Sequence, residues 1–107
     1  MSPTTHKASA DLKKALFSQC DQVSQVMKSL SHPIRLKILC STIDAEQGVN
    51  ALSEICDVSQ SAMSQFLKRM KTEGLLESRR EGTSIFYRIA DKKLLKLLAA
   101  VRDIYCK

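Results

Sequence analysis

Along most of this 107-residue chain the apolar residues recur at steps of three and four, which places them on one face of a helix. The pattern predicts five helices, over residues 11–30, 33–43, 49–56, 59–73 and 91–105. Residues 75–80 and 84–89 are typical of two strands joined by a glycine turn. We therefore expect a mainly α domain over residues 11–107, of order α-α-α-α-β-β-α, in which only the hairpin contributes strands. Residues 1–10 are polar, include His6, and are expected to form a frayed tail.

Several residues mark where these elements begin and end. Pro33 suits the first turn of a helix, because a proline lacks the amide hydrogen that this turn leaves unbonded. Ser59 can cap a helix with its hydroxyl, and Glu73-Gly74 is a stop signal for the same helix. Gly82 supplies the permissive backbone of the hairpin turn.

The helix that starts at Ser59 has two contrasting faces. One is an apolar stripe made by Ala62, Met63, Phe66, Leu67 and Met70. The other carries Ser61, Ser64, Gln65, Lys68 and Thr72, with Ser59 and Gln60 at its start. Short polar groups allow close approach to a base edge, Gln65 offers a donor and an acceptor together, and Lys68 can reach a base or a phosphate. A solvated amphipathic helix is the alternative, although such a face is usually richer in Glu–Lys pairs.

The hairpin that follows is basic, with Arg79 and Arg80 before its tip and Arg88 after it. Side chains alternate along a strand, so not all three can face DNA. Arg80 lies nearest the tip and is the first candidate for a phosphate or minor-groove contact. A short helix over residues 49–56 and a turn at Asp57-Val58 precede the reading helix, and the whole is the order of a winged helix-turn-helix.

Three stretches carry a resemblance to a known family: Ser31–Leu39 (SHPIRLKIL), the helix that begins SQSAMSQ at Ser59, and TSIFYRI from Thr83. With them the chain resembles the ArsR/SmtB family of bacterial transcriptional regulators, over about residues 20–106. The likeness is greatest to its metal-independent branch, which includes sulfide-responsive repressors and a haemolysin activator. The resemblance implies a transcriptional regulator whose partner is double-stranded DNA, and a dimer of reading helices fits an inverted-repeat operator.

Apolar residues at the two ends of the domain exceed what a small core needs. In the first helix the stripe is Leu12, Leu16, Cys20, Val23, Met27 and Leu30. In the last helix it is Leu94, Leu97, Leu98, Val101 and Tyr105, widened by Leu95, Ala99 and Ile104. We interpret the surplus as the interface of an obligate homodimer through the first and last helices. The alternative is that the two helices pack on each other within one monomer.

Composition limits the other classes of function. Basic residues number 17 against 11 acidic ones, and the net charge of +6 favours a polyanionic partner without identifying it. The chain has no phosphate loop, paired-carboxylate motif or Ser/His/Asp signature, and neither His6 nor His32 lies near a nucleophile motif, so we expect no enzyme and no cofactor. Without a signal peptide or a long apolar run, no membrane association and a cytoplasmic location are expected.

The resemblance also bears on metal binding. Metal-sensing members of the family carry thiolate ligands at positions that correspond here to Gly48 and Asn50. A second family metal site uses Asp, His and Glu on the last helix, where this chain offers Asp91 and Asp103 and no histidine. No metal site is therefore expected at either place.

Of the four cysteines, Cys40 and Cys106 match the positions of the dithiol in the sulfide-responsive and haemolysin-activating branch. The resemblance implies a pair that reactive sulfur species or oxidants would link. From the residues alone, a free cysteine is commonly a small core residue, which is how we interpret Cys20 and Cys56; a surface position is the alternative for Cys20. Lys37, one turn before Cys40, and Lys107, beside Cys106, are the cations available to lower the pKa of these thiols.

The sequence thus predicts a dimeric, sequence-specific DNA-binding regulator, a repressor by resemblance, which loses DNA affinity when Cys40 and Cys106 are oxidised or joined. One alternative is a thiol-independent constitutive regulator or antirepressor with the same DNA-facing residues. Another is a winged helix that binds protein and has lost DNA contact; such a face would be expected to lose Ser64, Gln65 and Lys68 or to gain acids.

Overall fold

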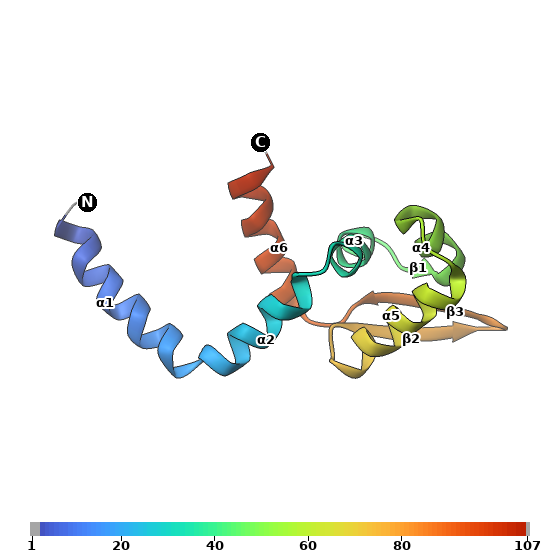
Figure 1. Cartoon of the computed structure of the whole chain (residues 1–107), viewed down its shortest axis with the longest axis horizontal. Coiled ribbons are helices and arrows are strands. Elements are labelled where there is room, and N and C mark those ends of the chain that lie inside the picture. Colours follow the sequence, from blue (N-terminus) through green and yellow to red (C-terminus); the bar gives the residue numbers. More distant parts are fainter. Residues whose placement is uncertain (1–2, 107) are drawn as a thin grey trace. The chain divides into compact units, whose positions relative to one another are not determined.

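The computed structural model describes residues 3–106, and side chains from residue 9 (Figure 1). Its elements are α1 (Pro3–Ser18), α2 (Cys20–Leu30), α3 (Pro33–Ser41), β1 (Gln47–Gly48), α4 (Val49–Cys56), α5 (Gln60–Thr72), β2 (Leu76–Glu81), β3 (Ser84–Ile89) and α6 (Lys92–Tyr105). The chain divides into two compact units, Met1–His32 and Pro33–Lys107. No helix in the described part of the chain is long and apolar enough to cross a membrane.

The first unit consists of two helices where the sequence predicts a single one over residues 11–30, and that prediction is wrong. The helix is interrupted at Gln19, whose backbone angles of −116° and 13° leave the helical range. The Ser18 hydroxyl donates to the carbonyl of Ala15 at 2.9 Å, and the Gln19 amide donates to that of Leu16 at 3.0 Å. These three-residue steps close α1 early. Helix α1 begins at Pro3, inside the expected tail; Met1, Ser2 and the side chain of His6 lie outside the described residues, and the tail over residues 1–10 stays a prediction.

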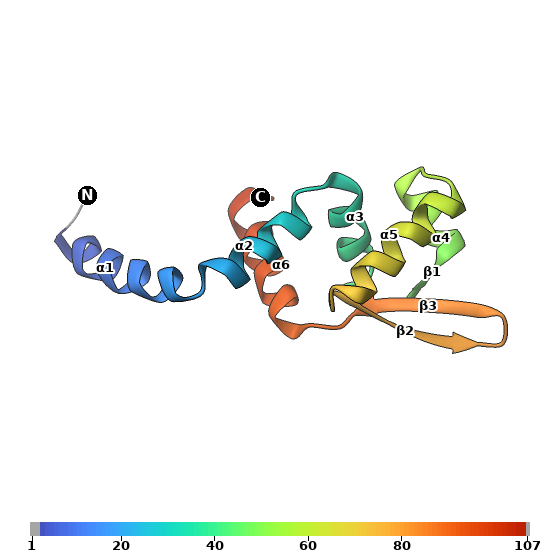
Figure 2. The ribbon, with the colours of Figure 1, turned by 60° about the horizontal axis from the view of Figure 1, so that its bottom comes forward.

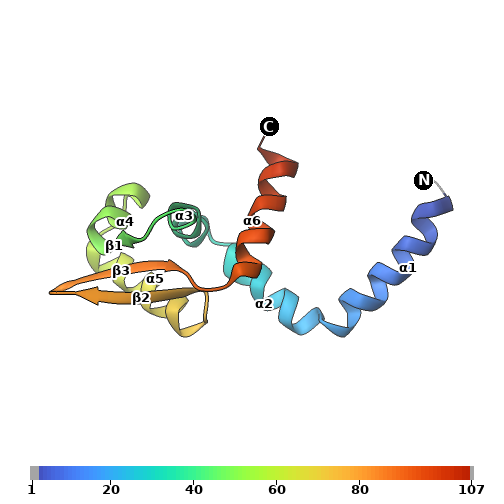
Figure 3. The ribbon, with the colours of Figure 1, turned by 180° about the vertical axis from the view of Figure 1, so that it is seen from behind.

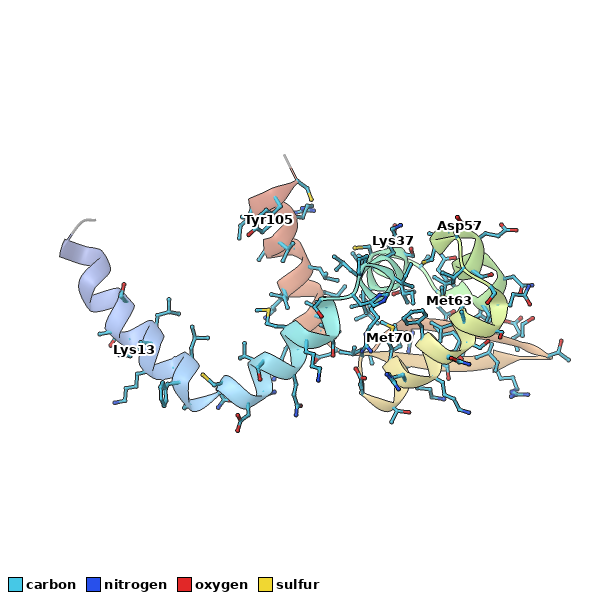
Figure 4. The ribbon with its side chains drawn as sticks, viewed as in Figure 1. Lys13, Lys37, Asp57, Met63, Met70 and Tyr105 are labelled. Carbon is cyan, nitrogen blue, oxygen red and sulfur yellow. The ribbon has the colours of Figure 1, made fainter. Side chains whose placement is uncertain are left out.

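The second unit encloses the apolar core. Helices α3, α4 and α5 pack in succession, and α5 packs against β2 of the sheet (Figure 2). The side chains with no exposed surface are Ile38, Leu39, Leu52, Met63, Leu67 and Met70. Met63 and Met70 lie within the crowded side chains that these helices and the sheet enclose (Figure 4). The core therefore fixes α5 from its inner face and leaves the other face open.

The sheet has three strands in the order β1-β3-β2, all antiparallel, where only the two-stranded hairpin was expected (Figure 3). The additional strand β1 pairs Gln47 with Tyr87 and Gly48 with Phe86. Two residues are too short to show an alternating pattern, so this strand exists because of its partner and not because of its own sequence. It attaches the hairpin to the residue from which α4 starts.

The predicted boundaries of the helix-turn-helix are confirmed by local geometry. Pro33 is the first residue of α3, and the Ser59 hydroxyl caps α5 by accepting the amide hydrogen of Ala62 at 3.1 Å. Gly74 has a φ of 81° just after α5, and Gly82 has a φ of 63° as the first residue of the two-residue turn after β2. Both are backbone conformations that glycine adopts without strain.

One boundary differs from the prediction. Helix α3 ends at Ser41 and not at Ile43, because the Thr42 hydroxyl donates to the carbonyls of Ile38 and Leu39 at 3.0 and 3.1 Å and closes the last turn. Ile43 is consequently 46% exposed, not part of the core.

Candidate DNA-binding surface

The outward face of α5 is the one that the sequence predicts. Ser61, Ser64, Gln65 and Lys68 are all exposed, whereas Met63, Leu67 and Met70 are buried on the opposite face. Gln60 is also exposed, in the first turn. Ser59 is exposed too, but its hydroxyl already serves as the helix cap. The face combines short polar groups with a cation and carries no acidic residue.

The turn before α5 holds this helix at a defined angle to α4. Asp57 adopts a left-handed conformation with a φ of 55°. Its amide donates to Glu54, and the Val58 amide donates to the carbonyl of Ser53 at 3.1 Å, which together satisfy the end of α4. Figure 4 shows Asp57 at this end of α4. The predicted turn at Asp57-Val58 is thereby confirmed.

Two exposed cations on α5 were not among the predicted site residues. Arg69 and Lys71 lie in its last turn and are exposed. Arg69 lies four residues after Gln65 and shares that side of the helix, so a full helical projection of the sequence would have found it. Cations at this end also interact favourably with the helix dipole.

The wing presents its arginines on two different faces. Arg79 and Arg88 lie on one face of the sheet, together with Glu77, Glu81 and Phe86, as the strand register requires. Arg79 is paired with Glu46 and Glu81, and Arg88 with Glu77. We call this side, with these carboxylates, the outer face.

Arg80 lies on the opposite face, in register with Ile85 and on the same side as Leu76 and Tyr87. Leu76 and Tyr87 are buried, and β2 packs against α5, so this is the side of the sheet that covers the reading helix. Arg80 itself is exposed, and within residues 3–106 it forms no ion pair. Of the three predicted wing contacts, it is the one directed to the α5 side.

Arg35 connects α3 to the far end of the reading helix. Its guanidinium forms an ion pair with Glu73, the C-cap residue of α5. The arginine side chain is only 12% exposed, and its Nε has no hydrogen-bond partner in the part of the chain that the structure describes. A cation this enclosed depends on its carboxylate, so the pair ties α3 to α5 firmly.

Cys40 and Cys106 are both exposed free thiols of the second unit, one near the end of α3 and the other as the C-cap of α6. Partial burial raises the pKa of Cys40, and the negative charge of the Cys106 thiolate raises it further. The two thiols are therefore close enough for their charges to interact. The expectation that Lys37 would lower the pKa of Cys40 is wrong, because the charge of Lys37 acts on Cys56 instead. Lys107 lies outside the described residues.

Of the remaining cysteines, Cys56 is a core residue as predicted, whereas Cys20 is not in the core. Cys56 is buried at the end of α4, and burial raises its pKa against the smaller lowering by Lys37. Cys20 is exposed at the first residue of α2. Gly48 and Asn50, where metal-sensing relatives would have ligands, lie at the N-cap and in the first turn of α4. Within the described residues no group of three or more His, Cys, Asp or Glu could hold a metal ion.

Exposed apolar side chains gather at the helices that were assigned to a dimer. In the first unit Leu12, Leu16, Phe17 and Met27 are 60%, 45%, 75% and 52% exposed. In α6 the predicted stripe is divided: Leu94 and Leu98 are buried, whereas Ile104 and Tyr105 are 64% and 79% exposed. These surfaces are available for association.

A reading helix on a buried core, a turn that sets its angle, and a basic hairpin beside it define a winged helix-turn-helix DNA-binding protein. The model of the arsR family of bacterial regulatory proteins matches residues 32–78. The biofilm growth-associated repressor of Xylella fastidiosa is 32% identical over 101 residues, 94% of this chain and 85% of the relative. The chain belongs to the ArsR family and is a DNA-binding transcriptional regulator, not an enzyme.

The fold is also similar to solved structures of transcriptional regulators. The crystal structure of the transcriptional repressor BigR from Xylella fastidiosa superposes with a TM-score of 0.82 at 30% identity, covering 89% of this chain and 97% of that one. The homodimeric winged helix-turn-helix domain of Mb0332 from Mycobacterium bovis gives a TM-score of 0.71 at 36% identity, covering 86% of this chain and 83% of that one.

Proposed function

We propose that the protein binds an inverted-repeat operator as a homodimer and releases it when Cys40 and Cys106 become joined. The observation that carries the DNA-binding part is the exposed face of α5, on which Ser61, Ser64, Gln65 and Lys68 stand clear of the core. These residues enter the major groove, with Gln60 and the cap residue Ser59 at the point of entry.

On the wing, Arg80 contacts a phosphate or the minor groove, since it is exposed on the α5 side of the sheet and has no carboxylate partner within residues 3–106. Arg88 stays a predicted contact, although Glu77 now neutralises it. Arg79 is paired twice, and a different role for it is inferred below.

Gln65 provides the test of base reading. Replacing Gln65 by Ala should weaken operator binding by about 1–3 kcal/mol and relax specificity at one base pair, because a bidentate contact to a base edge is lost. The operator is first located by footprinting the DNA upstream of the chain's own coding region, and affinities for it and for a random duplex are then compared. An equal loss on both duplexes would contradict base reading by Gln65.

A homodimer through the terminal helices is supported by the exposed apolar residues of α1, α2 and the end of α6. A single protomer offers one reading helix and thus half of an inverted repeat, whereas two give the paired contacts that specific affinity requires. The relative whose structure is described as homodimeric has the same winged helix-turn-helix.

The switch is supported by the positions of the two thiols. Cys40 lies near the end of α3, which Arg35 ties to the end of the reading helix, and Cys106 ends α6. A bond between them would therefore change the position of the reading helix α5 relative to α6, which we assign to the dimer interface. A small change in the spacing of the two reading helices of the dimer would lose DNA contacts that are together worth several kcal/mol.

The chemistry needs a polysulfide or another oxidant as co-reactant. One thiolate attacks a sulfane sulfur of the polysulfide and becomes a persulfide, while the shortened polysulfide leaves with the electron pair. The second thiolate then attacks the cysteine sulfur of the persulfide, expels hydrosulfide, and leaves a disulfide. If further sulfur atoms stay between the cysteines, the bridge spans more than the roughly 7 Å between Cα atoms that a direct disulfide tolerates.

One observation favours a second candidate, a thiol-independent regulator or antirepressor with the same DNA-facing residues. The pKa of Cys40 is raised by burial and by Cys106, which reduces the thiolate fraction at neutral pH and slows attack on sulfur or oxidant. In that candidate Cys40 and Cys106 are ordinary surface and packing residues.

The two candidates are separated by treating the reduced protein with polysulfide, mapping the modified cysteines by mass spectrometry, and measuring operator binding. The switch predicts release from DNA in the parent and retention in Cys40→Ser and Cys106→Ser. Because the pKa of Cys40 is raised, its modification should accelerate with pH beyond the range of an ordinary thiol. Removing the Cys106 charge should lower the pKa of Cys40 and hasten its alkylation in Cys106→Ser. If both single variants still release DNA as the parent does, the thiol-independent regulator is correct.

A further inference from the structure

Arg79 is the centre of a cluster on the outer face of the wing, formed with Glu46, Glu81 and Phe86. Its Nε donates to both carboxylate oxygens of Glu46, at 2.8 and 3.0 Å, and a terminal nitrogen donates to Glu81 at 2.7 Å. Its guanidinium carbon lies 4.9 Å from the centre of the Phe86 ring. A guanidinium between two carboxylates has its hydrogen-bond donors occupied on two sides. These are the same planar donors that would otherwise bind a phosphate.

The cluster joins three separate parts of the second unit. Glu46 stands immediately before β1, Arg79 is on β2, and Phe86 on β3 is in register with both Arg79 and Gly48. A Cβ on Gly48 would lie 3.8 Å from the Phe86 ring, so this ring lies against the short strand β1. The same ring also contacts the Arg79 guanidinium. Arg79 therefore connects the hairpin to the segment that leads into α4.

The two faces of the wing differ in net charge. The outer face carries Arg79 and Arg88 against Glu46, Glu77 and Glu81, which leaves it one negative charge in excess. The α5 side carries Arg80 without a carboxylate partner in the described chain. Approach of a DNA phosphate to the outer face would have to displace a carboxylate that already occupies the guanidinium.

We propose that Glu46 and Glu81 act as internal substitutes for phosphate, which withhold Arg79 from DNA, so that of the two arginines nearest the wing tip only Arg80 contacts it. Arg79 is then a positioning residue, and the two glutamates are determinants of specificity: they suppress sequence-independent binding without touching a base. The inference rests on the proposed DNA-facing role of Arg80.

The pairing with Glu46 and Glu81 matters because the Arg79 side chain is half exposed. Without these carboxylates it would be accessible to any polyanion in solution. Phosphate contacts supply nearly all of sequence-independent affinity and add nothing to the discrimination between sequences. An arginine released from its carboxylates would thus strengthen binding to random DNA at least as much as binding to an operator. Holding it internally lowers the background against which the operator is read.

The test measures the salt dependence of binding to a random-sequence duplex by fluorescence anisotropy. Each added phosphate contact steepens the slope of log affinity against log salt by about 0.9. The double variant Glu46→Gln/Glu81→Gln should gain about one such contact per protomer and so about two per dimer, and the loss of affinity between roughly 50 and 200 mM salt becomes about twelvefold larger. Arg79→Gln should leave the slope unchanged in the parent and abolish the gain in the double variant.

A matched control removes two negative charges without releasing an arginine. Asp44 and Glu54 are exposed and form no ion pair among residues 3–106, so Asp44→Asn/Glu54→Gln reproduces the change in net charge. An equal gain in this control, or a gain that survives Arg79→Gln, would overturn the inference, as would an unchanged slope in a Glu46→Gln/Glu81→Gln protein that melts like the parent. Arg80→Ala is measured beside them and should reduce the slope by about one unit per protomer. Failure of that variant alone would instead remove Arg80 from the proposed contacts.

Discussion

The helices before Pro33 and the winged domain after it expose their apolar residues to very different extents. In the winged domain Ile38, Leu52 and Leu67 have no exposed surface. In α1 and α2 no residue is buried among those whose side chains are described, and Leu12 and Phe17 are more than half exposed. The two regions have similar apolar periodicity, so the difference lies in what each has to pack against.

The contrast indicates two kinds of stability. The winged domain satisfies its own apolar surface with helices and a sheet, as a small domain must to fold by itself. A pair of helices with an open apolar stripe gains little from intrinsic helix propensity and depends on being covered. We therefore propose that the first region owes its order to association, whereas the second does not. Three changes would break or sharpen this comparison.

The largest effect is expected at Leu67, at the centre of the winged core. Leu67→Ala should lower the free energy of unfolding by about 2–5 kcal/mol, because it removes a fully buried side chain and leaves a cavity. Urea denaturation followed by circular dichroism measures it. Leu12→Ala, at a side chain 60% exposed, is the matched control within the first helix. An equal loss in both variants at a protein concentration where the parent is monomeric would contradict the contrast.

The next effect concerns association. Leu12→Glu/Leu16→Glu places charges on the open stripe of α1 and should convert a dimer into a monomer, which light scattering detects at micromolar concentration. Operator affinity should fall by about 100-fold, near 3 kcal/mol, since only half of the site is then read. Leu12→Met/Leu16→Met keeps the stripe apolar and serves as control. A parent that is already monomeric would refute the assignment of these helices to a dimer.

The smallest effect is expected at Asp57, where the winged domain alone should respond. Its φ of 55° is costly for a residue with a Cβ, and its negative charge lies at the negative end of α4. Asp57→Gly should raise the free energy of unfolding by up to about 1 kcal/mol without changing the oligomeric state. Asp57→Asn, which removes only the charge, should gain less. A loss of stability in the glycine variant would show that the Asp57 side chain contributes more than it costs.

Local chemistry explains which parts of the fold could be predicted from the sequence. Pro33, Ser59, Gly74 and Gly82 each act through bonds within a few residues, so their roles follow from the sequence alone. The outward face of α5 follows from helical periodicity in the same way. The interruption at Gln19 could not be predicted, because neither a glycine nor a proline marks it. The Ser18 hydroxyl that bonds there is no signal by itself, since serine also occurs inside helices.

What could not be predicted depends on residues distant in the sequence. Arg35 meets Glu73 across 38 positions, and Arg79 meets Glu46 across 33. Alternation along a strand already predicts that the adjacent Arg79 and Arg80 lie on opposite faces of the hairpin, and only the fold shows which of these faces packs against α5. The direction of the pKa shift of Cys40 also needed the fold, since the pKa is raised first by partial burial and then by the charge of Cys106, which is distant in the sequence.

The two-residue strand β1 has a consequence for the thermodynamics of binding. Gly48 ends β1 and Val49 begins α4, so the wing and the first helix of the helix-turn-helix meet without a linker. The conformational entropy of the wing is therefore lost when the chain folds and not when it meets DNA, which leaves a larger share of the contact energy as affinity. Calorimetry of operator binding should then report a heat-capacity change set by the protein–DNA contact area, without the additional contribution that folding of a disordered wing would bring.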